Sequence, residues 1–427
     1  MKERVLFLHI PKTAGTSIKH YLSLHYAAQD CLLDPSHVAI HRTIKDVDFN
    51  SYSLAAAHFD FDYVSRYRNR PFVLTCLRNP IARAISAYNF QRSPVLRYQF
   101  EMLSKAVGQT EESAAVRQVL DELDRLRACV SLSEFLAREP EQARKILGNI
   151  QTHYLAGAEA ASIHADEPRR LIEIAIANLR SCEGILLTER LSETLGQLAL
   201  PISTDPFGAV THDNATVRHV VDNAATRHED VLKDAELFAA LADLTSLDSE
   251  LYAAAETILE ERSRSPSPSP KGCFNSADNL PDATNFTFDQ PVRGRGWHMR
   301  ERGSEGYYCW SAGEATLFLS LATRGSHILR CRLLHVASSE AQDGLEATVN
   351  GVPVLVEVSH KTGSLWIEAP VPAHALENAR GQVCIAFRVP GLVRPSDRDS
   401  ANPDTRHLGI ALSRVQLLPT ETGDAYR

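Results

Sequence analysis

A short segment near the start of the chain combines the residue types that bind phosphate groups. Residues 11–17 read PKTAGTS; they follow the continuous apolar run VLFLHI and precede a helical pattern. The start of a helix presents free backbone N–H groups and the positive end of the helix dipole. Gly15 allows close approach of the backbone, and Thr16 and Ser17 add hydroxyl donors. Lys12 adds a mobile positive charge, so the segment predicts an anion-binding loop between a strand and a helix.

The order of residues in this loop differs from the Walker nucleotide-binding pattern. In GxxxxGK[ST] the Lys stands directly before the Ser or Thr whose hydroxyl binds magnesium. Here Lys12 precedes Gly15 by three positions. This order, directly after an apolar strand, resembles the 5′-phosphosulfate loop of the sulfotransferases, most closely the carbohydrate sulfotransferases of the heparan-sulfate 2-O type and their bacterial relatives. In that family the loop holds the 5′-phosphosulfate of the donor, 3′-phosphoadenosine 5′-phosphosulfate (PAPS). The residues at the matching positions are Lys12, Thr13, Ala14, Gly15, Thr16 and Ser17.

The resemblance implies a second donor-binding motif, in which an Arg and a Ser eight residues later bind the 3′-phosphate. The stretch LRNPIARAISAYNF supplies Arg78 and Ser86 at this spacing, directly after the apolar run FVLTCL. An Arg can bind a phosphate through two hydrogen bonds. Asn79 suits a helix N-cap and Pro80 suits the first helical turn. The alternative is that Arg78 pairs with a carboxylate and Ser86 lies on a helix surface, while Arg83 could assist the 3′-phosphate.

The transfer of a sulfuryl group to a hydroxyl needs a base and a positive charge near the leaving group. His58, in LAAAHFDFDYV, occupies the place of the family's catalytic His, although Ala57 replaces the usual Gly. A His with a pKa near neutrality suits general-base work; the alternative is a partly buried His with one hydrogen bond. Lys12 would stabilise the bridging oxygen of the leaving group. The sulfuryl group carries less charge than a phosphoryl group, so we expect no metal. His9 fits the core or a supporting position.

Three further stretches resemble family segments: GNIQTHYLAG, EGILLTERLSETL and HDNATVRH. The last contains Arg218 as a candidate contact to the donor. The resemblance covers about residues 4–225. Arg92, Arg97 and Tyr98 could line an acceptor cleft. In the C-terminal part, four aromatic residues could form a sugar-stacking platform, although burial in a β-sheet core is the more common fate of such residues. They are Trp297, Tyr307, Tyr308 and Trp310.

Composition limits the classes of protein and of partner. The chain has 427 residues, 44% of them apolar, and a formal net charge of −8, which argues against a broad nucleic-acid-binding surface. The eight scattered cysteines show no metal-ligand spacing, which is typical of reduced thiols. No signal-peptide pattern precedes the first apolar run, and no run approaches the length of about 20 apolar residues that a membrane span needs. We therefore expect a cytoplasmic protein without a transmembrane segment.

The pattern of elements predicts two domains. Apolar runs at 5–10, 72–77 and 184–188 alternate with helical patterns, which indicates a parallel α/β sheet with helices, P-loop-like, over residues 1–262. Residues 263–271, SRSPSPSPK, read as an extended linker. Short alternating runs separated by Gly, Pro and Asn predict an antiparallel β-sandwich over 272–420. This domain resembles, loosely, the accessory β-sandwiches of some bacterial carbohydrate-active enzymes.

Together these observations predict a PAPS-dependent sulfotransferase that acts on a hydroxyl of a carbohydrate or glycolipid. Two alternatives remain open. An ATP-dependent P-loop kinase would prefer ATP to the 3′-phosphorylated donor. A non-catalytic carbohydrate-binding protein would retain glycan binding after deletion of residues 1–262.

Overall fold

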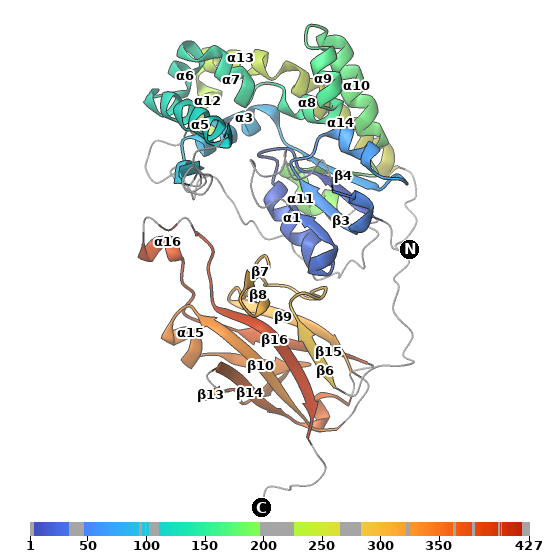
Figure 1. Ribbon diagram of the computed structural model, residues 1–427, viewed down its shortest axis with the longest axis vertical. Helices are drawn as coiled ribbons and strands as arrows, with labels where there is room; N and C mark the ends of the chain where they lie inside the picture. Colours follow the sequence, from blue (N-terminus) through green and yellow to red (C-terminus); the bar gives the residue numbers. More distant parts are fainter. Residues whose placement is uncertain are drawn as a thin grey trace, which may run out of the picture. The chain divides into compact units, whose positions relative to one another are not determined.

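The structure, a computed structural model, describes most of the chain. The described residues are 4–33, 47–93, 96–98, 100–101, 111–196, 226–264, 283–321, 325–361, 364–377, 381–399, 402 and 404–420. They divide into two compact units. His20–Cys31 and the described residues from 283 onward form the second unit, and the other described residues form the first. Figure 1 shows a helix-rich first unit and a strand-rich second unit.

A parallel sheet forms the centre of the first unit. Its order is β2-β3-β1-β4-β5, and β1 pairs in parallel with both β3 and β4, as β4 does with β5. Every residue of β1, β3, β4 and β5 is buried, which explains their continuous apolar runs. The bounds are β1 Val5–Leu8, β2 Cys31–Leu33, β3 Leu54–Ala57, β4 Phe72–Leu77 and β5 Gly184–Leu187. The predicted parallel α/β sheet is confirmed; β2 had no clear signal in the sequence.

Helices surround this sheet (Figure 1). They are α1 Gly15–Leu24, α3 Pro80–Gln91, α5 Glu111–Ala128, α6 Leu132–Arg138, α7 Pro140–Leu147, α8 Ile150–Ala156, α9 Ala158–Ile163, α10 Pro168–Ser181, α11 Leu191–Gly196, α12 His228–Lys233, α13 Ala235–Leu244 and α14 Ser246–Ser263. Side chains of α8, α10 and α14 share one core with the sheet, and α3 packs with α6, α7 and α13 in another. The predicted cap of α3 is confirmed, since Asn79 Oδ1 accepts from Ala82 N at 3.1 Å and Pro80 opens the helix.

Antiparallel sheets build the second unit. One has the order β13-β14-β10-β16-β8-β7, with β6 also paired to β16, and the other has the order β12-β11-β15-β9. The bounds are β6 Thr284–Thr287, β7 Glu301–Gly303, β8 Gly306–Trp310, β9 Glu314–Ser320, β10 His327–Val336, β11 Glu346–Val349, β12 Val352–Val354, β13 Glu357–Lys361, β14 Ser364–Val371, β15 Gln382–Arg388 and β16 Ile410–Pro419. Alternate residues of both sheets enter one core, for example Cys331 and Val415 with Leu317 and Ile385. The predicted antiparallel strands are confirmed.

Residues 20–31 belong to the second unit although they come early in the chain, and the division falls within α1. The guanidinium of Arg300 donates to the carbonyls of Ser23, Leu24 and Tyr26. The helix has no basic residue in its own last turn, so Arg300 supplies both hydrogen bonds and positive charge at its C-terminal end. Two backbone hydrogen bonds add to this anchor: Val292 N to Leu24 O and Ala28 N to Asp289 O, both 2.7 Å.

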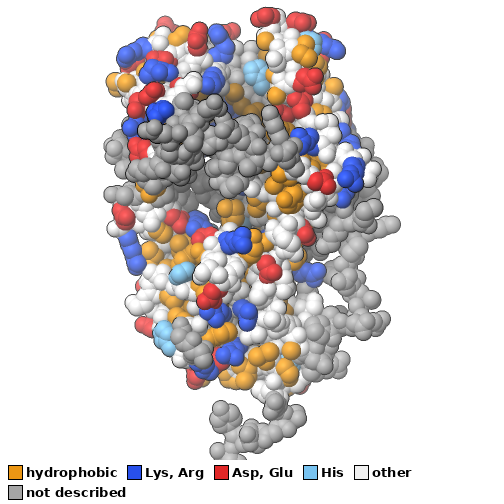
Figure 2. Space-filling view, viewed as in Figure 1, with side chains coloured by type: hydrophobic (Ala, Val, Ile, Leu, Met, Phe, Trp, Pro, Cys, Tyr) orange, Lys and Arg blue, Asp and Glu red, His pale blue; other side chains and the backbone are white. Residues whose placement is uncertain are grey.

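On the face seen in Figure 2, acidic and basic side chains are interspersed over the helices of the first unit. The seven cysteines that lie in the described ranges are free thiols. No helix in the described part of the chain combines the length and apolar character that crossing a bilayer requires.

Candidate functional site

Three of the predicted site residues come together because of the strand order. β3, β1 and β4 are neighbours and run parallel, so their carboxyl ends lie at one edge of the sheet. The Lys12 loop follows β1, His58 comes directly after β3, and Arg78 comes directly after β4. In open α/β sheets this edge is where ligands bind.

The loop after β1 has an unusual backbone. Lys12 has φ 71° and Ala14 has φ 62°, both in the left-handed region that non-glycine residues seldom adopt. Each such residue costs about 1–3 kcal/mol, and the cost is characteristic of ligand-binding loops. Left-handed residues that alternate with others are typical of anion-binding nests of N–H groups. Thr13, between them, is buried and donates from Oγ1 to Ile10 O at 2.9 Å, which holds the turn closed.

A neighbouring side chain leaves no room for a Cβ at position 15, so the residue there is glycine. A Cβ built at this position would lie 1.7 Å from Cδ2 of His9. The sequence suggested that this glycine serves close approach to a ligand; the structure shows that it makes room for the His9 ring. His9 is buried and stacks between Phe7 and His58, with ring centroids 5.8 and 4.1 Å away. His9 therefore occupies a supporting position, as predicted.

The ring of His58 is held in one orientation. Its Nδ1 lies 2.7 Å from the carbonyl oxygen of His9, and its ring stacks on the His9 ring. A carbonyl oxygen can only accept a hydrogen bond, so Nδ1 carries the proton. The lone pair of the neutral imidazole is then on Nε2, which is the tautomer a general base at this edge of the sheet would use. The role of His58 as base stays a prediction.

Two positive charges lie close together at this edge. Arg78 Nη1 donates to the backbone carbonyl of Lys12 at 3.2 Å. Arg78 Nε is buried and finds no hydrogen-bond partner among the described residues. The Lys12 Nζ lies over the Phe90 ring, 3.8 Å from its centroid. Burial, and next the charge of Arg78, lower the pKa of Lys12 to about 7; burial also lowers the pKa of Arg78. The arrangement favours an anionic ligand, which would offset both costs.

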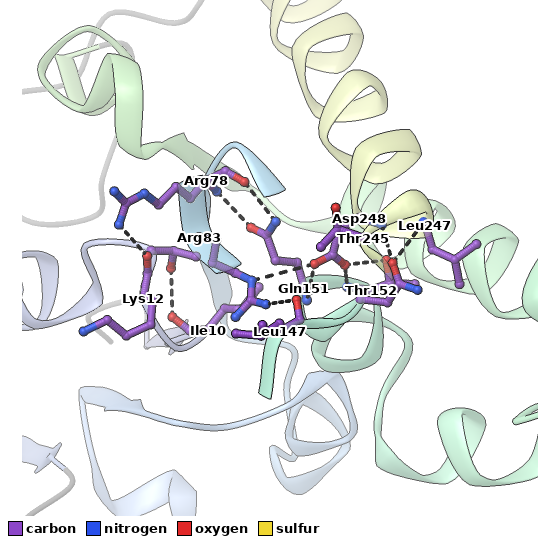
Figure 3. Close-up of polar contacts among 12 residues, drawn as sticks. Ile10, Lys12, Arg78, Arg83, Leu147, Gln151, Thr152, Thr245, Leu247 and Asp248 are labelled. Atoms are coloured by element: carbon purple, nitrogen blue, oxygen red, sulfur yellow. Dashed lines mark hydrogen bonds and ion pairs between the residues drawn. The ribbon is translucent and has the colours of Figure 1, made fainter. Parts of the chain in front are cut away.

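A buried amide fixes the backbone of Arg78. Gln151, in α8, accepts from Arg78 N at 2.8 Å and donates to Arg78 O at 2.9 Å (Figure 3). The Gln151 side chain is fully buried. These two hydrogen bonds hold the residue after β4 much as a neighbouring strand would, so they fix the point from which the guanidinium extends.

Asp248 in turn fixes α8. Its carboxylate accepts from Gln151 N at 3.2 Å and from the backbone and hydroxyl of Thr152, both at 2.8 Å (Figure 3). In return, Asn149 Oδ1 accepts from Leu247 N and Asp248 N at 3.0 and 3.1 Å. The N-termini of α8 and α14 thus each receive a side-chain cap from the other.

Arg83 does not serve the donor site as the sequence allowed. Its guanidinium is buried, lies 3.9 Å from Asp248 Oδ2 and donates to Leu147 O. Its charge therefore stabilises the packing of α3 against α7 and α14. No pattern in the sequence marked Asp248. For Gln151 the signal was the stretch GNIQTHYLAG, whose role the sequence did not specify.

Some of the remaining predicted site residues lie among the described residues, and Arg218 does not. Ser17 in α1 and Ser86 in α3 are buried, and Thr16 is half-buried. Arg218 lies outside the described residues. Of the acceptor-cleft candidates, Arg92 donates to Tyr88 Oη at 2.7 Å, Arg97 forms ion pairs with Glu101 and Asp124, and Tyr98 is exposed. These contacts give no support to an acceptor cleft at these positions.

No group of three or more His, Cys, Asp or Glu side chains within the described ranges is arranged to hold a metal ion. The described site brings together an imidazole, a lysine and an arginine, each following a strand at one edge of the parallel sheet.

The N-terminal part of the chain, which contains the described site, is similar to known sulfotransferases. Residues 1–155 match the model of the sulfotransferase family. A protein-tyrosine sulfotransferase from Arabidopsis thaliana is 29% identical over 105 residues, which are 23% of this chain and 19% of the relative. The chain thus spans about a fifth of that relative's length. A solved family GH115 4-O-methyl-α-glucuronidase, specific for decorated arabinogalactans, aligns over 73% of this chain and 40% of its own, at 12% identity and a TM-score of 0.22. A TM-score this low does not establish a shared fold. The matched segment contains Lys12, His58 and Arg78, so residues 1–155 are similar to the sulfotransferase family over the part of the chain that carries the predicted site.

Proposed function

We propose that the N-terminal part of the chain, residues 1–262, transfers a sulfuryl group from PAPS to a hydroxyl of a carbohydrate or glycolipid. The observation that carries the proposal is the pair of cationic positions at one sheet edge. The Lys12 loop presents a left-handed backbone and a helix N-terminus. Arg78, directly after β4, has a buried Nε that finds no hydrogen-bond partner among the described residues. PAPS has two anionic groups, and two anchors of this kind fit them.

The residues have separate roles in this proposal. Backbone N–H groups from Thr13 to Ser17 hold the 5′-phosphosulfate, and Arg78 with Ser86 holds the 3′-phosphate. When bound, PAPS supplies an activated sulfuryl group and a phosphate leaving group. Lys12 places positive charge near the bridging oxygen, where negative charge develops. His58 receives the acceptor's proton on Nε2, because Nδ1 is committed to the His9 carbonyl.

A second acceptor class has one specific observation in its favour. The relative with 29% identity is a protein-tyrosine sulfotransferase, so a tyrosine phenol is the competing hydroxyl. An acceptor panel of oligosaccharides, glycolipids and tyrosine-containing peptides, offered with labelled PAPS, separates the two. We expect label in the carbohydrate or glycolipid fraction; label only in the peptides would replace the proposed acceptor.

The donor site is tested by calorimetric binding of adenosine 3′,5′-bisphosphate without metal. We expect wild type to bind, and Arg78→Ala to lose about 2 kcal/mol or more, the worth of a hydrogen bond to a charged group. Arg190→Ala is the matched control: it removes the same charge from an exposed pair with Glu193 in the same unit. Binding that fails in folded wild type, or tighter binding of ATP than of the bisphosphate, would overturn the proposal.

A further inference from the structure

A carboxylate follows β5 at the same edge of the sheet as Arg78. β5 ends at Leu187 and pairs in parallel with β4, and Glu189 comes two residues after this end. The residue lies in the stretch EGILLTERLSETL. None of the roles in the proposed reaction falls to it, although its strand lies next to the one that ends at Arg78.

Both oxygens of the Glu189 carboxylate have partners. Oε1 accepts from Asn79 N at 3.0 Å, and Oε2 accepts from the hydroxyl of Tyr252, in α14, at 3.0 Å. Asn79 is the residue directly after Arg78 and caps α3. Glu189 therefore fixes the chain on the C-terminal side of Arg78, while Gln151 fixes the backbone of Arg78 itself.

The charge of Glu189 also acts on Arg78. Burial lowers the pKa of Arg78, and the negative charge of Glu189 works against this effect. A guanidinium that has lost water is costly unless a negative charge lies nearby. Glu189 thus offsets part of the cost of the Arg78 charge in the ligand-free protein.

A bound phosphate group would offset the same cost. Two negative charges near one guanidinium repel each other, so the gain from the second is smaller than it would be without the first. Removing the charge of Glu189 should therefore strengthen binding of a phosphate group at Arg78. Loss of a purely structural contact would have the opposite sign or no effect on binding.

We propose that Glu189 is a positioning residue whose charge also limits the affinity of Arg78 for the donor's 3′-phosphate. Sulfuryl transfer from PAPS leaves adenosine 3′,5′-bisphosphate, which must dissociate before the next donor binds. A counter-charge beside the phosphate anchor favours that dissociation. The inference rests on the proposed function, because it takes Arg78 as the anchor of the 3′-phosphate.

The test is calorimetric binding of adenosine 3′,5′-bisphosphate to the full-length protein and to Glu189→Gln. The amide keeps an oxygen acceptor for Asn79 N and removes the charge. Because Glu189 is exposed, we expect a Kd about two- to fivefold lower than in wild type at low salt, the range of an exposed charge pair. The difference should shrink at high salt. Glu250→Gln is the control, since it removes the same charge from an exposed pair with Arg169 in the same unit, and its Kd should equal that of wild type.

The same substitution in an Arg78→Ala background tests whether the effect passes through Arg78. We expect the gain to disappear there, because no guanidinium remains for the two negative charges to share. A Kd equal to or higher than that of wild type in folded Glu189→Gln, or a gain of full size without Arg78, would overturn the inference and leave the donor site standing. Failure of folded wild type to bind the bisphosphate would overturn the proposed function and this inference with it. Thermal unfolding of each variant verifies that it is folded.

Discussion

The lowered pKa of Lys12 predicts that donor binding takes up a proton. With a pKa of about 7, against an ordinary value of 10.5, Lys12 is half protonated at pH 7 in the ligand-free protein. The protonated fraction falls to about one-eleventh at pH 8 and about 1% at pH 9, because each pH unit above the pKa lowers this fraction nearly tenfold. A bound phosphate favours the charged amine and reverses the effect of burial and of Arg78.

The affinity for adenosine 3′,5′-bisphosphate should therefore fall as pH rises. Between pH 7 and 9 we expect the Kd to increase about 50-fold, or about 2.3 kcal/mol, provided that the anion keeps Lys12 protonated in the complex. The phosphates of the ligand have lost their second protons by then, since that pKa is about 6. The same shift makes the ligand-free protein more stable as pH rises from about 7 to 10.5, because in that range the unfolded chain binds the extra proton.

Calorimetry in two buffers of different ionisation enthalpy measures this linkage directly. At pH 8 we expect uptake of about 0.9 protons for each ligand bound. Lys12→Arg keeps its charge at every pH used, and Lys12→Met has no charge at that position. In both variants the Kd should therefore no longer change with pH between 7 and 9, whatever its absolute value. A wild-type Kd that stays constant from pH 7 to 9, or a slope that survives in Lys12→Met, would refute the reasoning.

Three further predictions concern the residues around this loop. His58→Gln should lower kcat about 10²- to 10⁴-fold, the usual worth of a general base, with bisphosphate affinity retained in calorimetry; a kcat near that of wild type would exclude His58 as the base. Asp248→Asn should lower the free energy of unfolding in urea by about 3–5 kcal/mol, because the buried Arg83 loses its counter-charge. The exposed Asp243→Asn is its control, and equal stability of the two variants would contradict this. Gln151→Ala should cost about 1–3 kcal/mol through its two lost hydrogen bonds and weaken bisphosphate binding; unchanged affinity would contradict its positioning role.

The sheet edge was predictable because its signals are local. A fully buried parallel strand is a continuous apolar run, and a polar residue directly after such a run lies at the carboxyl edge. Lys12, His58 and Arg78 each follow such a run, so strand adjacency places them together. The cap of α3 was equally local, since Asn79 and Pro80 are neighbours in the sequence.

The support of this edge was not predictable, because it depends on contacts between distant residues. Gln151 reaches the Arg78 backbone across 73 residues, and Asp248 reaches Thr152 across 96. No sequence motif marks either residue. The sequence allowed Arg83 as an additional contact to the 3′-phosphate, but the structure pairs it with Asp248. The aromatic residues of the second unit were ambiguous for a similar reason: whether a Trp enters a core or lines a cavity depends on which strand it pairs with.

The anchoring of residues 20–31 has a consequence for synthesis of the protein. The carbonyls of Ser23 and Tyr26 accept hydrogen bonds from the guanidinium of Arg300, which comes 277 and 274 residues later in the sequence. At about 5–20 residues per second, the ribosome delivers that arginine roughly 14–55 s after the helix has emerged. During this interval the last turn of α1 has neither its cap nor its cation. The helix that begins at the Lys12 loop is therefore among the first made and the last completed, and a fragment that stops at the Ser/Pro segment would never complete it.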